Sequence, residues 1–324
     1  MTRLAPTRAL APGWNREGQR PWPGSLEQHA GRELFVRRTP VEPDGSLPPA
    51  VFVHGLGGSA LNWTDLMALL RGRFAGVAPD LPGFGYSLPS PDRDYSVDAF
   101  VSAVGDVVEH EVARSGRPVA LFGNSLGGAV CVRLAARRPD LVDTLVLVSP
   151  ALPDFRPHPG VVLVPVLALP RLGEGLFRQM QRMPPERQVQ AMLETNFGDP
   201  SSLPHRRRQE VVEEYRRRMA LPYAGEALSA AARGLLKAFA DPSASGLWRE
   251  AGSLVAPTLL VYGGRDRLVN VRRVRRAAAV VPHAHAVVLP HVGHMAQVEA
   301  PQTLARFVLG FVDAAPHQSV ASPT

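Results

Sequence analysis

Residues 119–139 constrain the fold of this chain more than any other segment. They read VALFGNSLGGAVCVRLAARRP, an apolar run, then a serine flanked by glycines, then apolar residues at helical spacing. An apolar run that ends in glycine is typical of a buried strand, and the spacing after it is that of a helix. Gly123 and Gly127 have no Cβ atoms, so the chain can turn sharply around Ser125. The segment predicts a strand, a tight turn that exposes Ser125, and a helix.

Strand and helix patterns alternate along most of the remaining chain. Further strand patterns cover residues 50–55, 74–79, 142–150, 256–264 and 285–293, and a predicted hairpin covers residues 25–39. Strands that alternate with helices indicate a parallel sheet with helices on both faces. The alternation stops after residue 150 and resumes near residue 247. The sequence between these points has helical stretches, many prolines and no clear strand pattern, which predicts a helical insertion.

This order of elements predicts four parts of the chain. Residues 1–24 are expected to form an extension on the surface, and residues 25–150 and 247–313 an α/β core. Residues 151–246 would be a helical cap, or lid, on that core. Residues 314–324 are expected to be a disordered tail. A chain of 324 residues is long enough for one large core with such an insertion.

The composition narrows the classes of partner. The net charge is +7, and nearly all of the positive charge is arginine. The densest runs, residues 205–210 and 213–219, mix acidic and basic residues at helical spacing, which is typical of solvated, ion-paired helix faces. We therefore expect a small-molecule substrate and no nucleic acid. The single cysteine, Cys131, rules out an internal disulfide and is expected to pack in the core.

No stretch of the sequence resembles a membrane anchor. The longest apolar runs are cut by prolines well short of the ~20 residues that span a bilayer. The first 24 residues contain no apolar core of signal-peptide length. These features predict a cytoplasmic protein without an integral membrane span.

A serine hydroxyl needs a base to become a nucleophile. His294 is the best candidate, because it lies in a loop between the last strand and the last helix. In a parallel sheet, this loop lies at the same edge as Ser125. His291, at the preceding strand end, is expected to be structural. His283 and His285 complete a histidine cluster, but no acidic or thiol ligand accompanies it, so we expect no metal site and no cofactor.

The base needs an acid to orient it. Asp266 follows two glycines at a strand end, between Arg265 and Arg267. Asp154, which follows another strand end, is a rival. Glu299 is expected on the first turn of the final helix instead. We predict that Asp266 holds His294 through a hydrogen bond, as acid and base do in serine hydrolases.

The oxyanion formed by serine attack needs hydrogen-bond donors. One would be the backbone N–H of Leu126, directly after the nucleophile. The other would be the backbone N–H of Leu56 in the sequence HGLGG, where Gly55 and Gly57 allow a tight loop. His54 is expected to fix this loop through hydrogen bonds rather than to transfer protons. Asn124 is expected to support the turn at Ser125.

Taken together, these motifs resemble those of the α/β-hydrolase superfamily. The matching sequences are HGLGG, DLPGFGYS, GNSLGG, GGRDRLV and GHMAQVEAP, and the order Ser125, Asp266, His294 is that of its catalytic triad. The resemblance implies an eight-stranded, mostly parallel sheet with a helical cap between strands six and seven. Epoxide hydrolases and haloalkane dehalogenases of this fold use an aspartate where this chain has serine, so the resemblance favours a serine esterase or lipase.

Two alternatives remain open. GNSLGG is similar to the Gly-Asn-Ser-x-Gly-Gly of carbon–carbon bond hydrolases that act on ring-cleavage products. This chain departs from them in having Met295 after the histidine and no Gly-Pro in the HGLGG loop. Such an enzyme would need inward-facing arginines, for which Arg171, Arg178 and Arg182 are available. The other alternative is a ligand-binding protein that retains the triad.

The apolar stretches at residues 161–170 and 175–183 lie within the predicted cap. They can line an acyl pocket above the serine or pack the cap on the core. We expect packing to be their main role. Under the pocket interpretation, esters of medium-chain acids should be hydrolysed faster than acetates.

Overall fold

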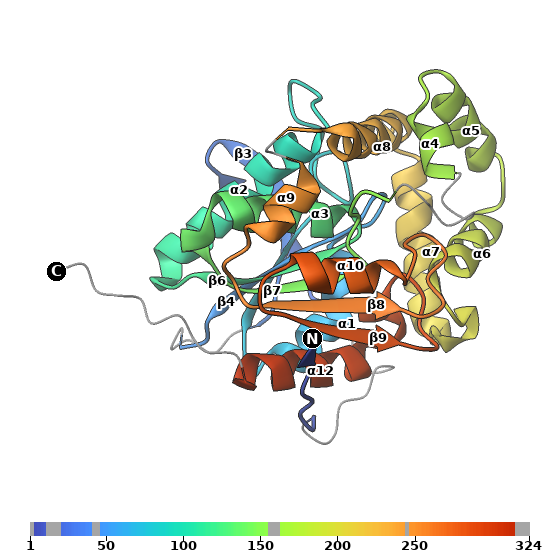
Figure 1. Cartoon of the computed structure of the whole chain (residues 1–324). Coiled ribbons are helices and arrows are strands. Elements are labelled where there is room, and N and C mark those ends of the chain that lie inside the picture. The colour runs from blue at the N-terminus through green and yellow to red at the C-terminus, as the bar shows by residue number, and fades with distance from the viewer. Residues whose placement is uncertain (1–2, 11–20, 41–45, 155–162, 244–245, 315–324) are drawn as a thin grey trace.

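A nine-stranded sheet forms the centre of the molecule (Figure 1). The computed structural model describes residues 3–10, 21–40, 46–154, 163–243 and 246–314. The strands are β1 (Arg3–Leu4), β2 (Gly24–His29), β3 (Arg32–Arg38), β4 (Pro49–Val53), β5 (Ala75–Pro79), β6 (Val119–Asn124), β7 (Val142–Val148), β8 (Thr258–Gly263) and β9 (Ala284–Leu289). Their order across the sheet is β1-β9-β8-β7-β6-β4-β5-β3-β2.

The sheet confirms the predicted fold class. Strands β2 to β9 are the expected eight. β2 pairs antiparallel with β3, β3 antiparallel with β5, and the other neighbours are parallel. β1 adds a short ninth strand, parallel to β9, so part of the N-terminal extension joins the sheet edge. The predicted tail at residues 315–324 lies outside the described residues, as do residues 11–20 of the extension.

Side chains on the central strands alternate between two cores, one on each face of the sheet. On β4, for example, Val51 and Val53 pack in one core while Phe52 packs in the other. The first core lies beneath α2 (Val97–Ser115), α3 (Leu126–Arg137), α9 (Leu247–Gly252) and α10 (Arg273–Val280). The second lies beneath α1 (Thr64–Leu70) and α12 (Pro301–Ala314). Cys131 is buried in the first core, as predicted.

The chain between β7 and β8 is helical, as expected. It contains α4 (Leu163–Ala168), α5 (Leu172–Gln181), α6 (Pro185–Asn196), α7 (His205–Met219) and α8 (Ala224–Ala240), here called the inserted helices, and then α9. They fall between the sixth and seventh of the eight predicted strands. In Figure 1, α4 to α7 lie beyond the ends to which the arrows of β8 and β9 point. The inserted helices therefore lie over the edge where the loops of the predicted site emerge. Among the described residues, no helix is long and apolar enough to cross a membrane.

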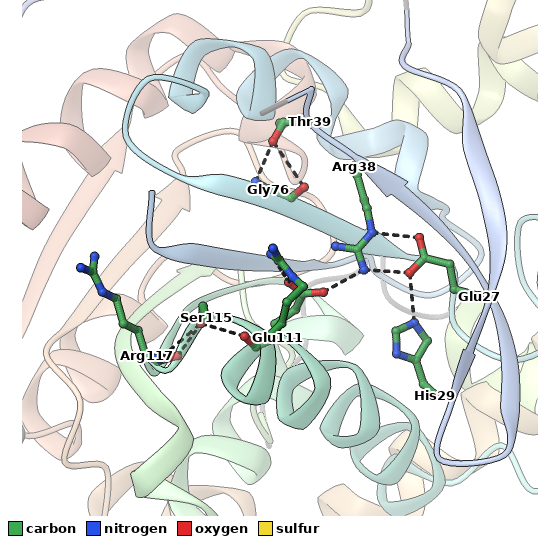
Figure 2. A network of polar contacts seen from close by, with 9 residues as sticks. Glu27, His29, Arg38, Thr39, Gly76, Glu111, Ser115 and Arg117 are labelled. Atoms are coloured by element: carbon green, nitrogen blue, oxygen red, sulfur yellow. Dashed lines mark hydrogen bonds and ion pairs between the residues drawn. The ribbon is translucent and has the colours of Figure 1, made fainter. Parts of the chain in front are cut away.

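A network of ion pairs attaches the β2–β3 hairpin to α2 (Figure 2). Arg38 on β3 donates to both carboxylate oxygens of Glu27 on β2, at 2.8 and 2.7 Å, and to Glu111 on α2 at 2.8 Å. Burial acts to raise the pKa of the Glu111 carboxyl, but the contacts with Arg38 and Arg114 outweigh it and hold that pKa below its usual value. This network stabilises the edge of the sheet formed by β2 and β3, which lies away from the strand-end loops.

Candidate active site

Ser125 lies in a strained turn between β6 and α3. Its backbone has φ 54° and ψ −118°, a conformation that costs energy for a residue with a side chain. The turn is also tightly packed. A Cβ on Gly123 would lie 2.5 Å from the carbonyl oxygen of Gly127, and a Cβ on Gly127 would lie 2.3 Å from that of Val53. Only glycine fits at these two positions, which accounts for the spacing of the motif.

His294 and Asp266 lie together behind this turn. His294 follows β9 and Asp266 follows β8, so adjacent strand ends bring them together across 28 residues of sequence. Nδ1 of His294 lies 2.9 Å from Oδ2 of Asp266, and both side chains are buried. With the Nδ1 proton donated to the carboxylate, Nε2 is the nitrogen that can accept a proton.

Asp266 is held as a carboxylate by several donors. Its Oδ1 accepts hydrogen bonds from the backbone N–H groups of Leu268 and Val269, at 2.8 and 2.9 Å. Burial acts to raise the pKa of Asp266, but the interaction with His294 and the hydrogen bonds outweigh it, so the pKa lies below its usual value. Asp266 is therefore an acceptor for both the imidazole of His294 and the backbone.

The two other candidate acids, Asp154 and Glu299, bind other groups of the protein. Asp154 forms an ion pair with Arg273 of α10. Glu299 lies at the end of the short helix α11 (Ala296–Glu299), close to its expected place. It accepts from the backbone N–H of Gly293 at 2.6 Å and from that of Gly198 at 3.0 Å. Glu299 therefore joins the loop that carries His294 to the inserted helices, a positioning contact that the sequence did not reveal.

The HGLGG loop lies against the serine turn. A Cβ on Gly55 would be 3.1 Å from the Cβ of Ser125, and the turn is closed by a 3.0 Å hydrogen bond from the Gly58 N–H to the Gly55 carbonyl. Leu56 lies within this turn and lines the same cavity as Ser125. Leu126 is the first residue of α3, so its N–H has no partner within the helix. Both residues thus lie close to the serine, and their role as oxyanion donors stays a prediction.

Buried polar side chains hold these loops. His54 is completely buried; its Nδ1 lies 2.8 Å from the Gly55 carbonyl, and its Nε2 accepts from the Leu81 N–H at 3.0 Å. This geometry fits the expected fixing role. Asp80, at the end of β5, accepts from the N–H groups of Ala60 at 2.6 Å and Tyr86 at 2.8 Å. Asp80 was not identified from sequence, although its place at a strand end was a signal.

Asn124 connects two parts of the site. Its Nδ2 donates to the carbonyl of His294 at 3.1 Å and to that of Val148 at 3.0 Å. The side chain therefore reaches beyond its own turn to the loop of the histidine, 170 residues away in sequence. We infer that Asn124 positions that loop.

We expect His54 to make the stability of the protein sensitive to acid. Burial and the charge of Arg218 outweigh the hydrogen bond to Gly55 and lower the pKa of His54 from 6.5 to about 4. The unfolded chain therefore binds the proton more readily, so the contribution of His54 to the free energy of unfolding is complete above pH 6.5 and falls toward pH 4. Between pH 7 and pH 5 the loss should be about 2 kcal/mol. Urea unfolding at both pH values should show a loss that is larger in native protein than in His54→Asn by about this amount. Equal losses in both proteins would contradict the assignment.

A cavity of about 790 Å³ opens beside these loops. Ser125, His294 and Leu56 line it on the side of the sheet, and the inserted helices line the opposite side. Five of the seven methionines in the chain contribute to its wall, namely Met180, Met183, Met192, Met219 and Met295. Methionine side chains are flexible and apolar, so this wall can adapt to ligands of different shape.

The inserted segment thus does more than pack on the core. Described residues of both apolar stretches line the cavity, among them Val164, Leu167, Phe177 and Met180. Residues 161–162 lie outside the described part of the chain. Packing on the core was expected to be the main role of the two apolar stretches. The structure corrects this expectation, because both stretches also line the cavity.

The positions of the arginine side chains in the insertion also differ from those that the sequence suggested. Arg171, Arg178 and Arg182 are exposed and do not line the cavity. The runs at 205–210 and 213–219 are ion-paired, as predicted, but they are not simply solvated. Arg207 and Glu214 of α7 are buried and line the cavity, because α7 packs against the core there. Helical spacing predicted the pairing but not this packing.

Among the described residues, no group of three or more His, Cys, Asp and Glu side chains is placed to hold a metal ion. His283 and His291 are exposed, and His291 lies 3.4 Å from Arg265. The histidine cluster of the sequence is therefore not gathered around one point in the structure.

Comparison with known proteins places this geometry in a family. Residues 48–301 match the family model described as the alpha/beta hydrolase fold, which covers more than half of the chain. This chain belongs to the alpha/beta hydrolase family. An esterase of Mycobacterium tuberculosis is 31% identical over 274 residues, covering 83% of this chain and 84% of that protein.

Other members differ in what they act on. A 2-hydroxy-6-oxo-6-(2'-aminophenyl)hexa-2,4-dienoic acid hydrolase of Metapseudomonas resinovorans is 25% identical, over 83% of this chain and 85% of that protein. The crystal structure of a bacterial membrane phospholipase A superposes with a TM-score of 0.71 and 25% identity, covering 90% of this chain and 86% of that one. The family is therefore shown, whereas its members span several substrate classes.

Proposed function

We propose that the protein is a serine hydrolase that cleaves carboxylic esters of small to medium apolar acids. The observation that carries the proposal is the arrangement of Ser125 and His294 on one cavity, with His294 hydrogen-bonded to the buried Asp266. Similarity to an esterase over most of both chains supports the same class.

The proposed reaction has two stages. Ser125 Oγ attacks the acyl carbonyl while Nε2 of His294 takes the hydroxyl proton, and the N–H groups of Leu56 and Leu126 stabilise the oxyanion. His294 then protonates the leaving alkoxide, and an acyl-enzyme remains. Water, deprotonated by His294, attacks the acyl carbon and releases the acid and Ser125. Asp266 stabilises the imidazolium in both stages. No cofactor takes part in this scheme.

Two arginines of the cavity are already paired with carboxylates, which favours esters over the acidic dienols of ring cleavage. Arg207 donates to the carboxylates of Asp65 and Glu210, and Arg273 pairs with Asp154. A substrate carboxylate would have to compete with these groups for each guanidinium. The carbon–carbon hydrolase is therefore the second candidate, carried by the similarity to the dienoic acid hydrolase. The helical cap at residues 151–246 and the cytoplasmic location stay predictions.

We expect medium-chain esters to react faster than acetate. Each methylene buried against the apolar wall can raise kcat/KM by up to about fourfold, since its transfer from water contributes ~0.8 kcal/mol. Initial rates on nitrophenyl esters from acetate to laurate measure this profile. Met180→Glu, which places a charge on the cavity wall, should slow long-chain esters selectively. The matched control is Arg178→Glu, on the exposed side of the same helix.

Two outcomes would redirect the proposal. A preference for acetate would show that the cavity does not bind the acyl chain. A ring-fission dienoic acid turned over much faster than any ester would support the carbon–carbon hydrolase instead.

A further inference from the structure

Two neighbouring arginines of α7 bind the backbone of two loops of the core. Arg218 donates through Nη1 to the carbonyl oxygens of Gly57 and of Gly58, the latter at 3.1 Å. Arg217 donates through Nη2 to the carbonyl of Gly85 at 2.8 Å. These contacts join the inserted helices to residues more than 130 positions earlier in the chain.

A glutamate on the same helix forms ion pairs with both side chains. Oε1 of Glu214 accepts from Arg217 Nη2 at 3.0 Å, and it lies 3.6 Å from Arg218 Nε. Glu214 is buried, and the Arg218 side chain is only 17% exposed. An arginine restrained in this way presents its donors in a fixed direction, with little side-chain entropy left to lose.

The carbonyls that Arg218 binds belong to the turn that carries Leu56. Gly57 has a φ of 68°, a left-handed conformation in which its two adjoining peptide groups have few steric restraints. A peptide group is planar, so fixing a carbonyl oxygen also fixes the direction of the N–H in the same group. Binding of the Gly57 carbonyl thus fixes the N–H of Gly58, which donates to the Gly55 carbonyl at 3.0 Å. That carbonyl shares its peptide group with the N–H of Leu56, so the contacts of Arg218 restrict the direction of this N–H.

Arg218 also brings a positive charge to the wall of the cavity. Arg218 lines the cavity together with Ser125 and His294. A guanidinium stays protonated at all working pH values. Such a fixed charge favours negative charge that develops on a substrate oxygen nearby.

We propose that Arg218 is a positioning residue for the oxyanion site, so that the inserted helices complete this site rather than only cover it. The inference rests on the proposed function, because it assigns Leu56 the role of oxyanion donor. It goes beyond that function by placing part of the machinery on α7. Opening of α7 away from the core would, on this reading, disable catalysis as well as admit substrate.

The test compares three variants of α7 on one nitrophenyl ester. Arg218→Met removes the donors and the charge but keeps an apolar stem. Arg218→Lys keeps the charge and loses the fork that reaches two carbonyls. Arg216→Met is the matched control, because Arg216 is exposed and pairs with Glu186 on the surface. All are checked by circular dichroism and thermal melting.

The expected result is a loss of turnover without a loss of substrate binding. In Arg218→Met, kcat should fall by about 10²-fold, as when one oxyanion donor is removed, with KM almost unchanged. Arg218→Lys should recover part of kcat, and Arg216→Met should match native protein. A trifluoromethyl ketone, whose adduct with Ser125 carries an oxyanion, should bind Arg218→Met more weakly by a similar factor.

Other results would overturn the inference in recognisable ways. Native kcat in Arg218→Met, or equal losses in the Arg218 and Arg216 variants, would show that Arg218 does not position the site. Loss of kcat with undiminished ketone affinity would also contradict it. If native protein neither turns over esters nor forms the ketone adduct at Ser125, the proposed function itself is wrong, and the role of Arg218 falls with it.

Discussion

Ser125→Ala is expected to abolish ester hydrolysis almost completely, with kcat lower by a factor on the order of 10⁶. The variant removes the atom that forms the acyl-enzyme, and His294 and Asp266 cannot act without it. Alanine fits the space of serine and keeps a Cβ, so the strained turn should keep its shape. Initial rates on the preferred nitrophenyl ester, with active-site titration of the native protein, measure the effect.

Thr195→Ala is the matched control for this change. Thr195 also lines the cavity, but its hydroxyl donates to the carbonyl of Ala191 at 2.8 Å on its own helix. Its loss should leave kcat of the same order as in native protein. Substantial turnover by Ser125→Ala on any ester would mean that another group starts the reaction, and the proposed mechanism would be wrong.

Asp266→Asn should have the second largest effect, a fall in kcat of about 10⁴-fold. The asparagine amide can present an N–H to Nδ1 of His294, which then takes the tautomer with its proton on Nε2. That tautomer cannot accept the proton of Ser125. The variant also removes the negative charge that stabilises the imidazolium, although Oδ1 can still accept from Leu268 and Val269. Initial rates on the same nitrophenyl ester measure the effect.

Asp154→Asn separates the two acids that the sequence offered. Asp154 pairs with Arg273, whereas Nδ1 of His294 lies against Asp266, so replacement of Asp154 should leave kcat close to that of native protein. A larger loss in Asp154→Asn than in Asp266→Asn would reverse the assignment of the acid. Thermal melting of both variants would identify losses that come from unfolding.

Much of the fold could be predicted because it follows from short-range patterns. The strand, turn and helix around Ser125 depend on apolar periodicity and on two glycines within five residues, and the structure shows why a Cβ is excluded at both. The carboxyl ends of parallel strands lie at one edge of the sheet. His294 and Asp266 could therefore be placed near each other from the sequence alone. The N-terminal strand β1 was missed because two residues carry no readable period.

The contacts that hold the site were harder to predict, because they join distant segments. Asp80 and Glu299 bind backbone N–H groups, which every residue except proline offers, so nothing in the sequence of the partner marks the contact. Arg218 binds the backbone carbonyls of Gly57 and Gly58, and every residue offers a backbone carbonyl. In addition, the run of arginines that contains Arg218 has the sequence pattern of an ordinary surface helix.

The sequence by itself determined the fold family, the order of the strands and helices along the chain, and which serine, histidine and aspartate are candidates for catalysis. These properties depend on local sequence patterns and on the order of the strand-end loops along the chain. Only the tertiary structure decided which acid forms the hydrogen bond with His294, which residues line the cavity and how α7 contacts the loop of Leu56. Helical periodicity tells which side chains share a face, but the partner of that face depends on how the whole chain packs.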